Sequence, residues 1–141
     1  MRKLALDLGS KSCGFAITDY FEIIPSGLEN FIYNEGQFNE VLNRIEYYLN
    51  QYKNEIDGLV IGYPLKISGE KSQTTLMVES FIELIKTKFN LPIVLINEQY
   101  STKRAQETLM SAGLNNKKRK QFKDKLAAVF ILQDYLDYYK K

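Results

Sequence analysis

The sequence contains no histidine and only one cysteine, and both shortages limit the chemistry available to it. Without histidine there is no imidazole base, no His–Cys pair and no imidazole ligand for a metal. Cys13 alone can form neither an intramolecular disulfide nor a cysteine cluster for zinc. Any catalysis must therefore rest on carboxylates, hydroxyls, lysines or a bound metal.

Long apolar runs are also absent. No stretch approaches the ~18 uninterrupted apolar residues of a membrane span, and the amino terminus lacks the charged lead, apolar run and cleavage site of a secretory signal. With the lone cysteine, these absences favour a cytoplasmic protein that does not bind membranes. The net charge of +2 is too small to indicate nucleic-acid binding by itself, so the local clustering of charge matters more.

What the chain does contain is the alternation typical of a mixed α/β sheet in a single domain, residues 1–141. Short apolar or β-rich segments predict strands at 4–8, 13–18, 23–31, 58–62 and 92–96. Apolar spacings of three, four and seven predict amphipathic helices at 37–53, 74–89, 101–112 and 126–139. The first two strands form an antiparallel pair joined by the turn at residues 9–12, and 23–31 is an edge strand interrupted by Pro25 and Gly27.

Asp7 places a charge in the middle of the first predicted strand. Because strand side chains alternate, it shares its sheet face with Ala5 and points away from Leu6 and Leu8. A carboxylate in such a place costs several kcal/mol of desolvation unless it is paired or bound to a cation. A salt bridge to a lysine is one explanation, and a metal site is the other.

Two further acids raise the odds of a metal site. Glu98 follows the strand at 92–96, and ligands bind at the carboxyl ends of strands in such sheets. Asp124 precedes the buried face of the last helix, where Ala127 and Ala128 let the helix approach the sheet closely. Taken singly, Glu98 also fits a surface loop, and Asp124 also fits an acid favoured by the helix dipole.

Together, Asp7, Glu98 and Asp124 predict three carboxylates that converge on one point. Oxygen ligands without histidine or cysteine select Mg²⁺ or Mn²⁺. Such ions can clamp the attacking and leaving oxygens of a phosphodiester.

Four ordered blocks, LALDLGSKSCGFAITD, GLVIGYPLKISGEKS, INEQYST and KDKLAAVFILQDYLD, resemble the YqgF/RuvX family, which is Holliday-junction-resolvase-like and belongs to the ribonuclease H superfold. The resemblance covers essentially the whole chain. It implies a five-stranded mixed sheet, with the first three strands antiparallel, flanked by helices. It also implies a metal-dependent nuclease site whose acids fall on Asp7, Glu98 and Asp124.

The resemblance further implies a hydrolase that matures the 5′ end of the small-subunit (16S) ribosomal RNA precursor, and thus a role in ribosome biogenesis. Its partners would be structured RNA or the pre-ribosome, with four-way DNA junctions as the alternative substrate. The block around Glu98 departs from the family's Asp-Glu-Arg-Leu-Thr-Thr, because Gln99 stands where the arginine is usual. The acid is kept, but one potential phosphate contact is lost.

Several basic residues are candidates for contacts with phosphate. Lys11 lies in the first turn, and Lys66 and Lys71 belong to a segment that fits the family's Gly-x-Pro-x-x-x-x-Gly loop. Arg104 and the run Lys117, Lys118, Arg119 and Lys120 would add contacts that weaken as salt rises. A solvated loop between helices explains the basic run equally well. Asp19, at the end of the second strand, is predicted to be structural.

Two other functions fit parts of the sequence. The segment DLGS followed by Gly14 also resembles the phosphate loop of actin and sugar-kinase proteins, but those need two copies of such a fold and 141 residues supply one. A nucleic-acid-binding factor without catalysis is the second, and the three acids argue against it.

Overall fold

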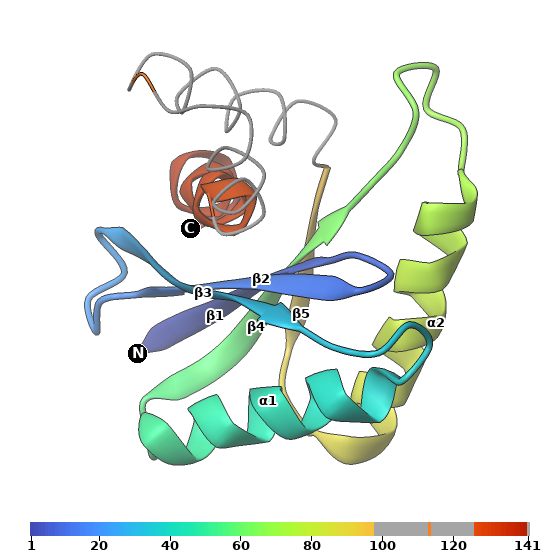
Figure 1. The fold of residues 1–141 in the computed structure, drawn as a ribbon. Helices are drawn as coiled ribbons and strands as arrows, with labels where there is room; N and C mark the ends of the chain where they lie inside the picture. The colour runs from blue at the N-terminus through green and yellow to red at the C-terminus, as the bar shows by residue number, and fades with distance from the viewer. Residues whose placement is uncertain (98–112, 114–125, 141) are drawn as a thin grey trace.

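The computed structural model describes residues 1–97, 113 and 126–140. They contain one five-stranded sheet of order β3-β2-β1-β4-β5 (Figure 1). The strands are β1 (Arg2–Leu8), β2 (Ser12–Thr18), β3 (Pro25–Ile32), β4 (Ile56–Tyr63) and β5 (Ile93–Asn97). The helices are α1 (Phe38–Gln51) and α2 (Gln73–Lys88), and residues 126–134 form a further helix that continues into the π-helix η1 (Tyr135–Tyr139).

The first three strands form an antiparallel meander, as predicted. β1 pairs antiparallel with β2, and β2 with β3. The tight turn between β1 and β2 closes through a 2.7 Å hydrogen bond from the Gly9 N–H to the Ser12 carbonyl. The Tyr33 N–H donates to the Lys11 carbonyl at 3.0 Å, and the Tyr33 hydroxyl donates to the Gly9 carbonyl. The end of β3 therefore fixes the turn that carries Lys11.

The third strand begins later than the sequence indicates, at Pro25 instead of Ile23. The Asp19 carboxylate accepts the backbone N–H groups of Ile23 and Ile24 at 2.6 and 2.8 Å. Those donors are therefore unavailable for pairing with β2, and the two residues belong to the connection. As predicted, β3 is an edge strand.

β4 and β5 are parallel to β1, because helices return the chain between them. α1 buries Val41, Leu42, Ile45 and Tyr48 on one face, at the predicted helical spacing. α2 begins with a capping box in which Ser72 and Thr75 satisfy each other's backbone N–H groups. Both helices match their predicted positions to within two residues.

The sheet has a core on each face. Leu4, Leu6 and Leu8 pack with α1 and α2 in the larger core. Ala5 and the buried β4 residue Val60 pack against the C-terminal helix, which Figure 1 shows in red on the opposite side of the sheet. In the larger core Phe15 lies 5.1 Å from the Tyr48 ring, measured between centroids.

One predicted helix, at 101–112, lies outside the described residues. Gly113, its predicted stop, has the left-handed φ of +77° that favours glycine. Among the described helices, none is long and apolar enough to cross a membrane.

Candidate active site

Asp7 lies on β1, the central strand of the sheet, next to its carboxyl end. Its side chain is partly buried, whereas Leu6 and Leu8 on either side are fully or nearly fully buried in the larger core. Asp7 therefore shares the opposite face with Ala5, as strand alternation predicts. This is the face that the C-terminal helix covers.

The helix approaches this face closely because small residues meet there. Ala5 and Ala16 on the sheet and Ala128 on the helix are all completely buried in the same core. Ile131 and Tyr135 continue the contact along the helix. The predicted role of the alanines, to bring this helix against the sheet, is confirmed for Ala128.

Glycines lie on both sides of Asp7. In β2 the residue directly opposite Asp7 is Gly14. In β4, Leu6 pairs with Ile61, so the next residue along is Gly62. At the positions directly beside Asp7, neither neighbouring strand therefore carries a side chain. Sequence reasoning did not connect these glycines with Asp7, although a glycine inside a strand often marks a close approach by a ligand or another backbone.

The first turn holds Lys11 at the same end of β1. Its backbone is fixed by the Tyr33 hydrogen bond described above, and its side chain is exposed. Within the described part of the chain, the Lys11 ammonium makes no ion pair. It is thus available to an anion.

The loop from β4 to α2 rises from the neighbouring strand end (Figure 1). An isolated bridge pairs Leu65 with Lys71, and Gly69 turns the chain between them with a φ of +87°. The buried Thr75 hydroxyl donates to the Pro64 carbonyl and fixes the base of the loop to α2. The loop is therefore an ordered hairpin rather than an open connection.

The two loop lysines differ in their surroundings. Lys66 is exposed near the tip. Lys71 forms a 2.8 Å ion pair with Glu79 on α2, whose carboxylate also accepts a hydrogen bond from the Tyr63 hydroxyl. The hydrogen bond to Glu79 raises the pKa of Lys71, and hydrogen bonds from Lys71 and Tyr63 lower the pKa of Glu79. Part of the Lys71 charge is thus already compensated.

The other candidate residues, Glu98, Gln99, Arg104, Lys117, Lys118, Arg119, Lys120 and Asp124, lie outside the described residues. Within 1–97, 113 and 126–140, no group of three or more acids or cysteines is arranged to hold a metal ion. Of the three predicted carboxylates, these residues include Asp7 alone.

Asp19 is structural, as predicted. Its carboxylate accepts the N–H groups of Phe21, Ile23 and Ile24 at 3.2, 2.6 and 2.8 Å, at the far end of β2 from the Asp7 edge. The hydrogen bonds from Ile24 and Ile23 lower its pKa. It holds the connection between β2 and β3.

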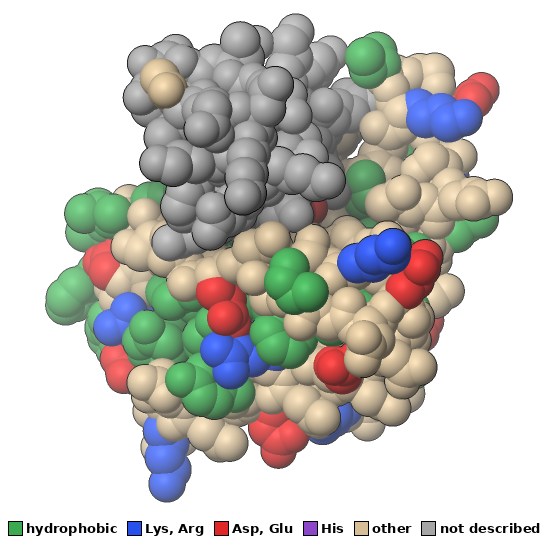
Figure 2. Space-filling view, viewed as in Figure 1, with side chains coloured by type: hydrophobic (Ala, Val, Ile, Leu, Met, Phe, Trp, Pro, Cys, Tyr) green, Lys and Arg blue, Asp and Glu red, His purple; other side chains and the backbone are tan. Residues whose placement is uncertain are grey.

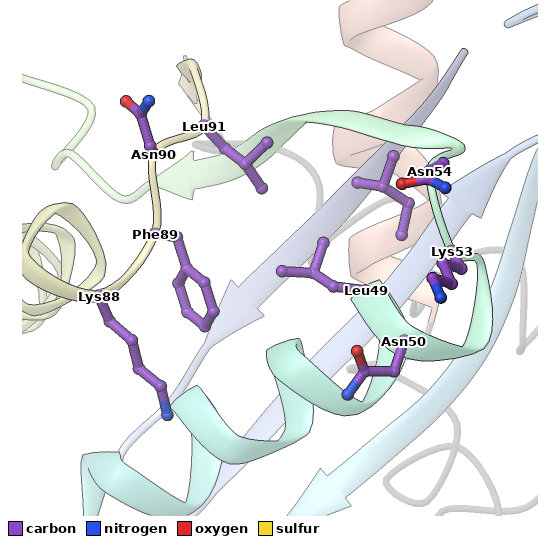
Figure 3. A pocket seen from close by; sticks show the side chains of 9 residues that line it. Leu49, Asn50, Lys53, Asn54, Lys88, Phe89, Asn90 and Leu91 are labelled. Carbon is purple, nitrogen blue, oxygen red and sulfur yellow. The ribbon is translucent and has the colours of Figure 1, made fainter.

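A separate hollow of about 460 Å³ lies between the end of α1 and the segment that precedes β5 (Figure 3). Leu49, Phe89 and Leu91 point toward one another across it, and Lys53 and Lys88 stand at its rim. Ile56, the first residue of β4, also lines it, so the hollow lies at the amino ends of the parallel strands. It is distinct from the site around Asp7.

Comparison with known proteins identifies the family of this chain. The family model described as "RuvX: Holliday junction resolvase" matches residues 1–138. A Mycoplasmopsis synoviae protein named "Putative pre-16S rRNA nuclease" is 46% identical over 140 residues, covering 99% of this chain and 100% of the relative. A Ureaplasma parvum protein of the same name is 48% identical over 141 residues, covering 96% of each. The chain belongs to the RuvX (YqgF) family.

A solved structure shows the same architecture for this RuvX chain. It resembles T. thermophilus RuvC in complex with a Holliday junction substrate, with a TM-score of 0.54, 12% identity, and coverage of 96% of this chain and 94% of that one. At this identity the likeness concerns the fold, which is ribonuclease H-like. The names of the RuvX family and its relatives describe nucleases, which are hydrolases that act on nucleic acid.

Proposed function

We propose that this RuvX protein is a divalent-metal-dependent endonuclease whose first metal ligand is Asp7. The observation that supports this proposal is the position of Asp7. It is a partly buried carboxylate on the central strand, with Gly14 opposite it on β2 and Gly62 beside it on β4. A partly buried carboxylate is stabilised by a cation, and the glycines add no side chains beside it.

Glu98 and Asp124 would complete the ligand set. Ile96 belongs to the same core as Ala5, and therefore to the face of Asp7, and Glu98 follows two residues later in the sequence. Ala128 packs on that face, and Asp124 precedes it by four residues, about one helical turn. Three carboxylates without histidine or cysteine suit Mg²⁺ or Mn²⁺.

The metal, when bound, would supply an activated water and stabilise the leaving oxygen of a phosphodiester. The chain's own residues would bind and orient the substrate. Lys11 lies on the turn after β1, and Lys66 and Lys71 lie on the loop after β4. The turn and the loop therefore flank the edge of the sheet that bears Asp7. Arg104 and the run Lys117, Lys118, Arg119 and Lys120 are proposed as further phosphate contacts.

The proposed substrate is the precursor of small-subunit ribosomal RNA, cleaved near the 5′ end of the mature 16S sequence in the cytoplasm. The names of the curated relatives support it. A four-way DNA junction is the alternative, supported by the description of the family model. Both substrates present phosphodiesters in a folded backbone, so the same metal chemistry serves either.

The test is cleavage by the purified protein, with Mn²⁺ or Mg²⁺, of a transcript spanning the 5′ end of 16S RNA and its leader and of a synthetic four-way junction. Asp7→Asn should lower cleavage by more than about a hundredfold, because even outer-shell partners of metal ligands are worth 10–100-fold. Asp137→Asn, on the exposed side of the C-terminal helix, is the matched control and should cleave like the parent.

The outcomes separate the alternatives. Cleavage of the transcript alone supports the RNA substrate, and cleavage of the junction alone supports the resolvase. Binding without cleavage by the parental protein, with either metal, would favour a non-catalytic nucleic-acid-binding factor. Parental activity in Asp7→Asn would refute the assignment of the metal site.

A further inference from the structure

The hairpin between β4 and α2 carries an exposed apolar side chain at its tip. Ile67 is 78% exposed, and its neighbours Lys66 and Ser68 are exposed as well. Figure 1 shows this hairpin projecting beyond the end of β4, and in Figure 2 the same projection bears hydrophobic, basic and acidic side chains. Turns are usually built from glycine, proline, asparagine, aspartate or serine. An isoleucine this exposed contributes little to the core.

The tip is held in one conformation. The Gly69 N–H donates to the Lys66 carbonyl at 2.8 Å, and the Lys66 N–H donates to the Glu70 carbonyl at 2.9 Å. With the left-handed φ of Gly69, these bonds describe a three-residue loop, 67–69, closed by a glycine bulge. A segment that is already ordered loses less entropy on binding. Ile67 is therefore presented to solvent by a preformed loop.

Ile67 lies within reach of a substrate bound at Asp7. Gly62 lies beside Asp7 in the register between β4 and β1, and Ile67 follows Gly62 by five residues. An extended chain spans at most about 3.3–3.6 Å per residue, so Ile67 and Gly62 are at most about 18 Å apart. Successive nucleotides of a DNA strand are about 3.4 Å apart along the helix axis. The tip can thus meet bases up to about five nucleotides from a phosphodiester at Asp7.

Lysines lie on both sides of Ile67 in the hairpin. Lys66 precedes it, and Lys71 lies on the returning arm, where the isolated bridge pairs it with Leu65. Ammonium groups that contact the phosphates of a strand fix its register without reading its sequence. An apolar side chain between them can then reach the bases. Proteins that kink nucleic acid use isoleucine, leucine, phenylalanine and methionine in this way, as wedges between base steps.

A single projecting side chain suits a base step better than a protein surface. Each partner in a stable protein complex of standard size buries ≈ 800 Å². Even an aromatic side chain buries only about 150–250 Å², and the residues around Ile67 at the tip, Lys66, Ser68 and Glu70, are polar or charged. The hairpin therefore lacks the apolar area of a protein interface. One base step, in contrast, can be filled by one side chain.

We propose that Ile67 is a wedge that unstacks one base step of the nucleic-acid substrate, within about five nucleotides of the phosphodiester at Asp7. This proposal rests on the function proposed above, because it takes that phosphodiester as the bond to be cleaved. Unstacking kinks the backbone, and the kink would turn the phosphodiester toward the carboxylates. Ile67 is thus a positioning residue. Weakly stacked steps, beside an unpaired nucleotide in folded RNA or at the branch of a junction, would be preferred.

The test measures base stacking in the bound substrate. The 16S transcript and the four-way junction carry 2-aminopurine, a base whose fluorescence rises when it unstacks, at one position at a time around the 5′ end or the branch point. Binding is measured in EDTA, at protein concentrations that saturate the fluorescence anisotropy. Ile67→Ser removes the wedge, and it should fold because serine is common in turns. Ile67→Leu keeps a wedge of similar size and should restore the effect.

Ile23→Ser is the matched control. Ile23 is 66% exposed, and it lies beyond the end of β2, at the far end of the sheet from Asp7. Circular dichroism verifies that each variant is folded. The proposal expects fluorescence to rise at one or more positions with the parent, Ile67→Leu and Ile23→Ser, and most of the rise to be lost in Ile67→Ser. Cleavage with Mn²⁺ should be slower by about tenfold or more in Ile67→Ser, at unchanged Mn²⁺ affinity, because small misplacements of a reacting group are costly.

Three results overturn the proposal: no rise with the bound parent, an equal rise with Ile67→Ser, or an equal loss in Ile23→Ser. Cleavage by the parent without an Ile67-dependent rise refutes the wedge and leaves the nuclease assignment intact. An Ile67-dependent rise without cleavage by the parent refutes the nuclease and retains the wedge in a nucleic-acid-binding factor. A parent that binds neither substrate, with or without Mn²⁺, refutes both.

Discussion

Asp7 on β1 lies directly opposite Gly14 on β2. In an antiparallel pair, opposite residues project to the same face with Cβ atoms about 4.5–5.5 Å apart. A side chain at position 14 would therefore stand beside the Asp7 carboxylate, on the face covered by the C-terminal helix. Gly14 is itself buried, and it adds no side chain beside the carboxylate.

Gly14→Val should consequently impair the proposed metal site more than the fold. Valine suits a strand, but its methyl groups would occupy the space beside Asp7 and displace the metal or its water ligands. We expect Mn²⁺ affinity and cleavage to fall by about tenfold or more, in the range seen when the surroundings of a metal ligand change. Calorimetric titration with Mn²⁺ measures this effect.

The control for this variant is Gly14→Ala, which adds one methyl group and should have a smaller effect. Thermal unfolding of both variants shows whether the fold is retained. Parental Mn²⁺ affinity and cleavage in a folded Gly14→Val protein would show that the space is not used by the metal.

The contact between Asp7 and Gly14 illustrates what the sequence could and could not predict. Alternation within one strand was enough to place Asp7 on the face of Ala5. The neighbours of Asp7 depend on strand order and register, which arise from pairing between distant segments and leave no local pattern. The start of β3 was misplaced for a different, local reason: Ile23 and Ile24 have strand-like side chains, but the Asp19 carboxylate, four and five residues earlier, accepts their N–H groups.

The pairing of Lys71 with Glu79 predicts a gain of RNA binding when Glu79 is neutralised. In Glu79→Gln the ammonium loses its 2.8 Å partner and its full charge becomes available to phosphate. We expect tighter binding of the transcript and a slope of log affinity against log salt that is steeper by about 0.7–0.9, as for one additional phosphate contact. Fluorescence anisotropy at several salt concentrations measures both quantities.

Glu83→Gln is the matched control, because it makes the same change of charge on the same helix. Glu83 pairs with Lys86 at 3.5 Å, and both side chains are highly exposed. If Glu79→Gln and Glu83→Gln raise affinity equally, the effect is one of net charge, and Lys71 is not a specific phosphate contact.

The hydrogen bonds to the Asp19 carboxylate should make its contribution to the stability of the fold disappear in acid. Its pKa is lowered by hydrogen bonds from the N–H groups of Ile24 and Ile23, so its contribution is present above the unfolded pKa, about 3.9, and is lost as pH falls through the folded value. The difference in melting temperature between the parent and Asp19→Ala should therefore be constant near neutral pH and shrink below about pH 4. Melting curves from pH 7 to pH 2.5 measure it, and a difference that stays constant throughout would contradict this role.

The Lys3 ammonium, at the amino end of β1, is expected to contribute strongly to stability through its ion pairs with Glu22 and Asp57. Burial alone would lower the pKa of Lys3, but hydrogen bonds to Asp57 and Glu22 raise it above the ordinary value. The side chains of Lys3 and Glu22 are only 14 and 15% exposed. The Lys3 stem also passes over Gly58, where a Cβ atom would lie 3.0 Å from the Lys3 Cδ.

Lys3→Met keeps most of this packing and removes the charge, which leaves Glu22 and Asp57 without their shared cation. We expect the free energy of unfolding to fall by about 2–3 kcal/mol, chiefly because the largely buried Glu22 carboxylate loses its partner, whereas Asp57 is 43% exposed. Urea unfolding at pH 7 measures it. Lys86→Met breaks the exposed pair with Glu83 and should change the free energy by less than about 0.5 kcal/mol. Equal losses in the two variants would mean that the Lys3 ion pairs contribute no more than a surface pair, and that Glu22, with its left-handed φ of 56°, is held by hydrogen bonds from Tyr135 and Lys140.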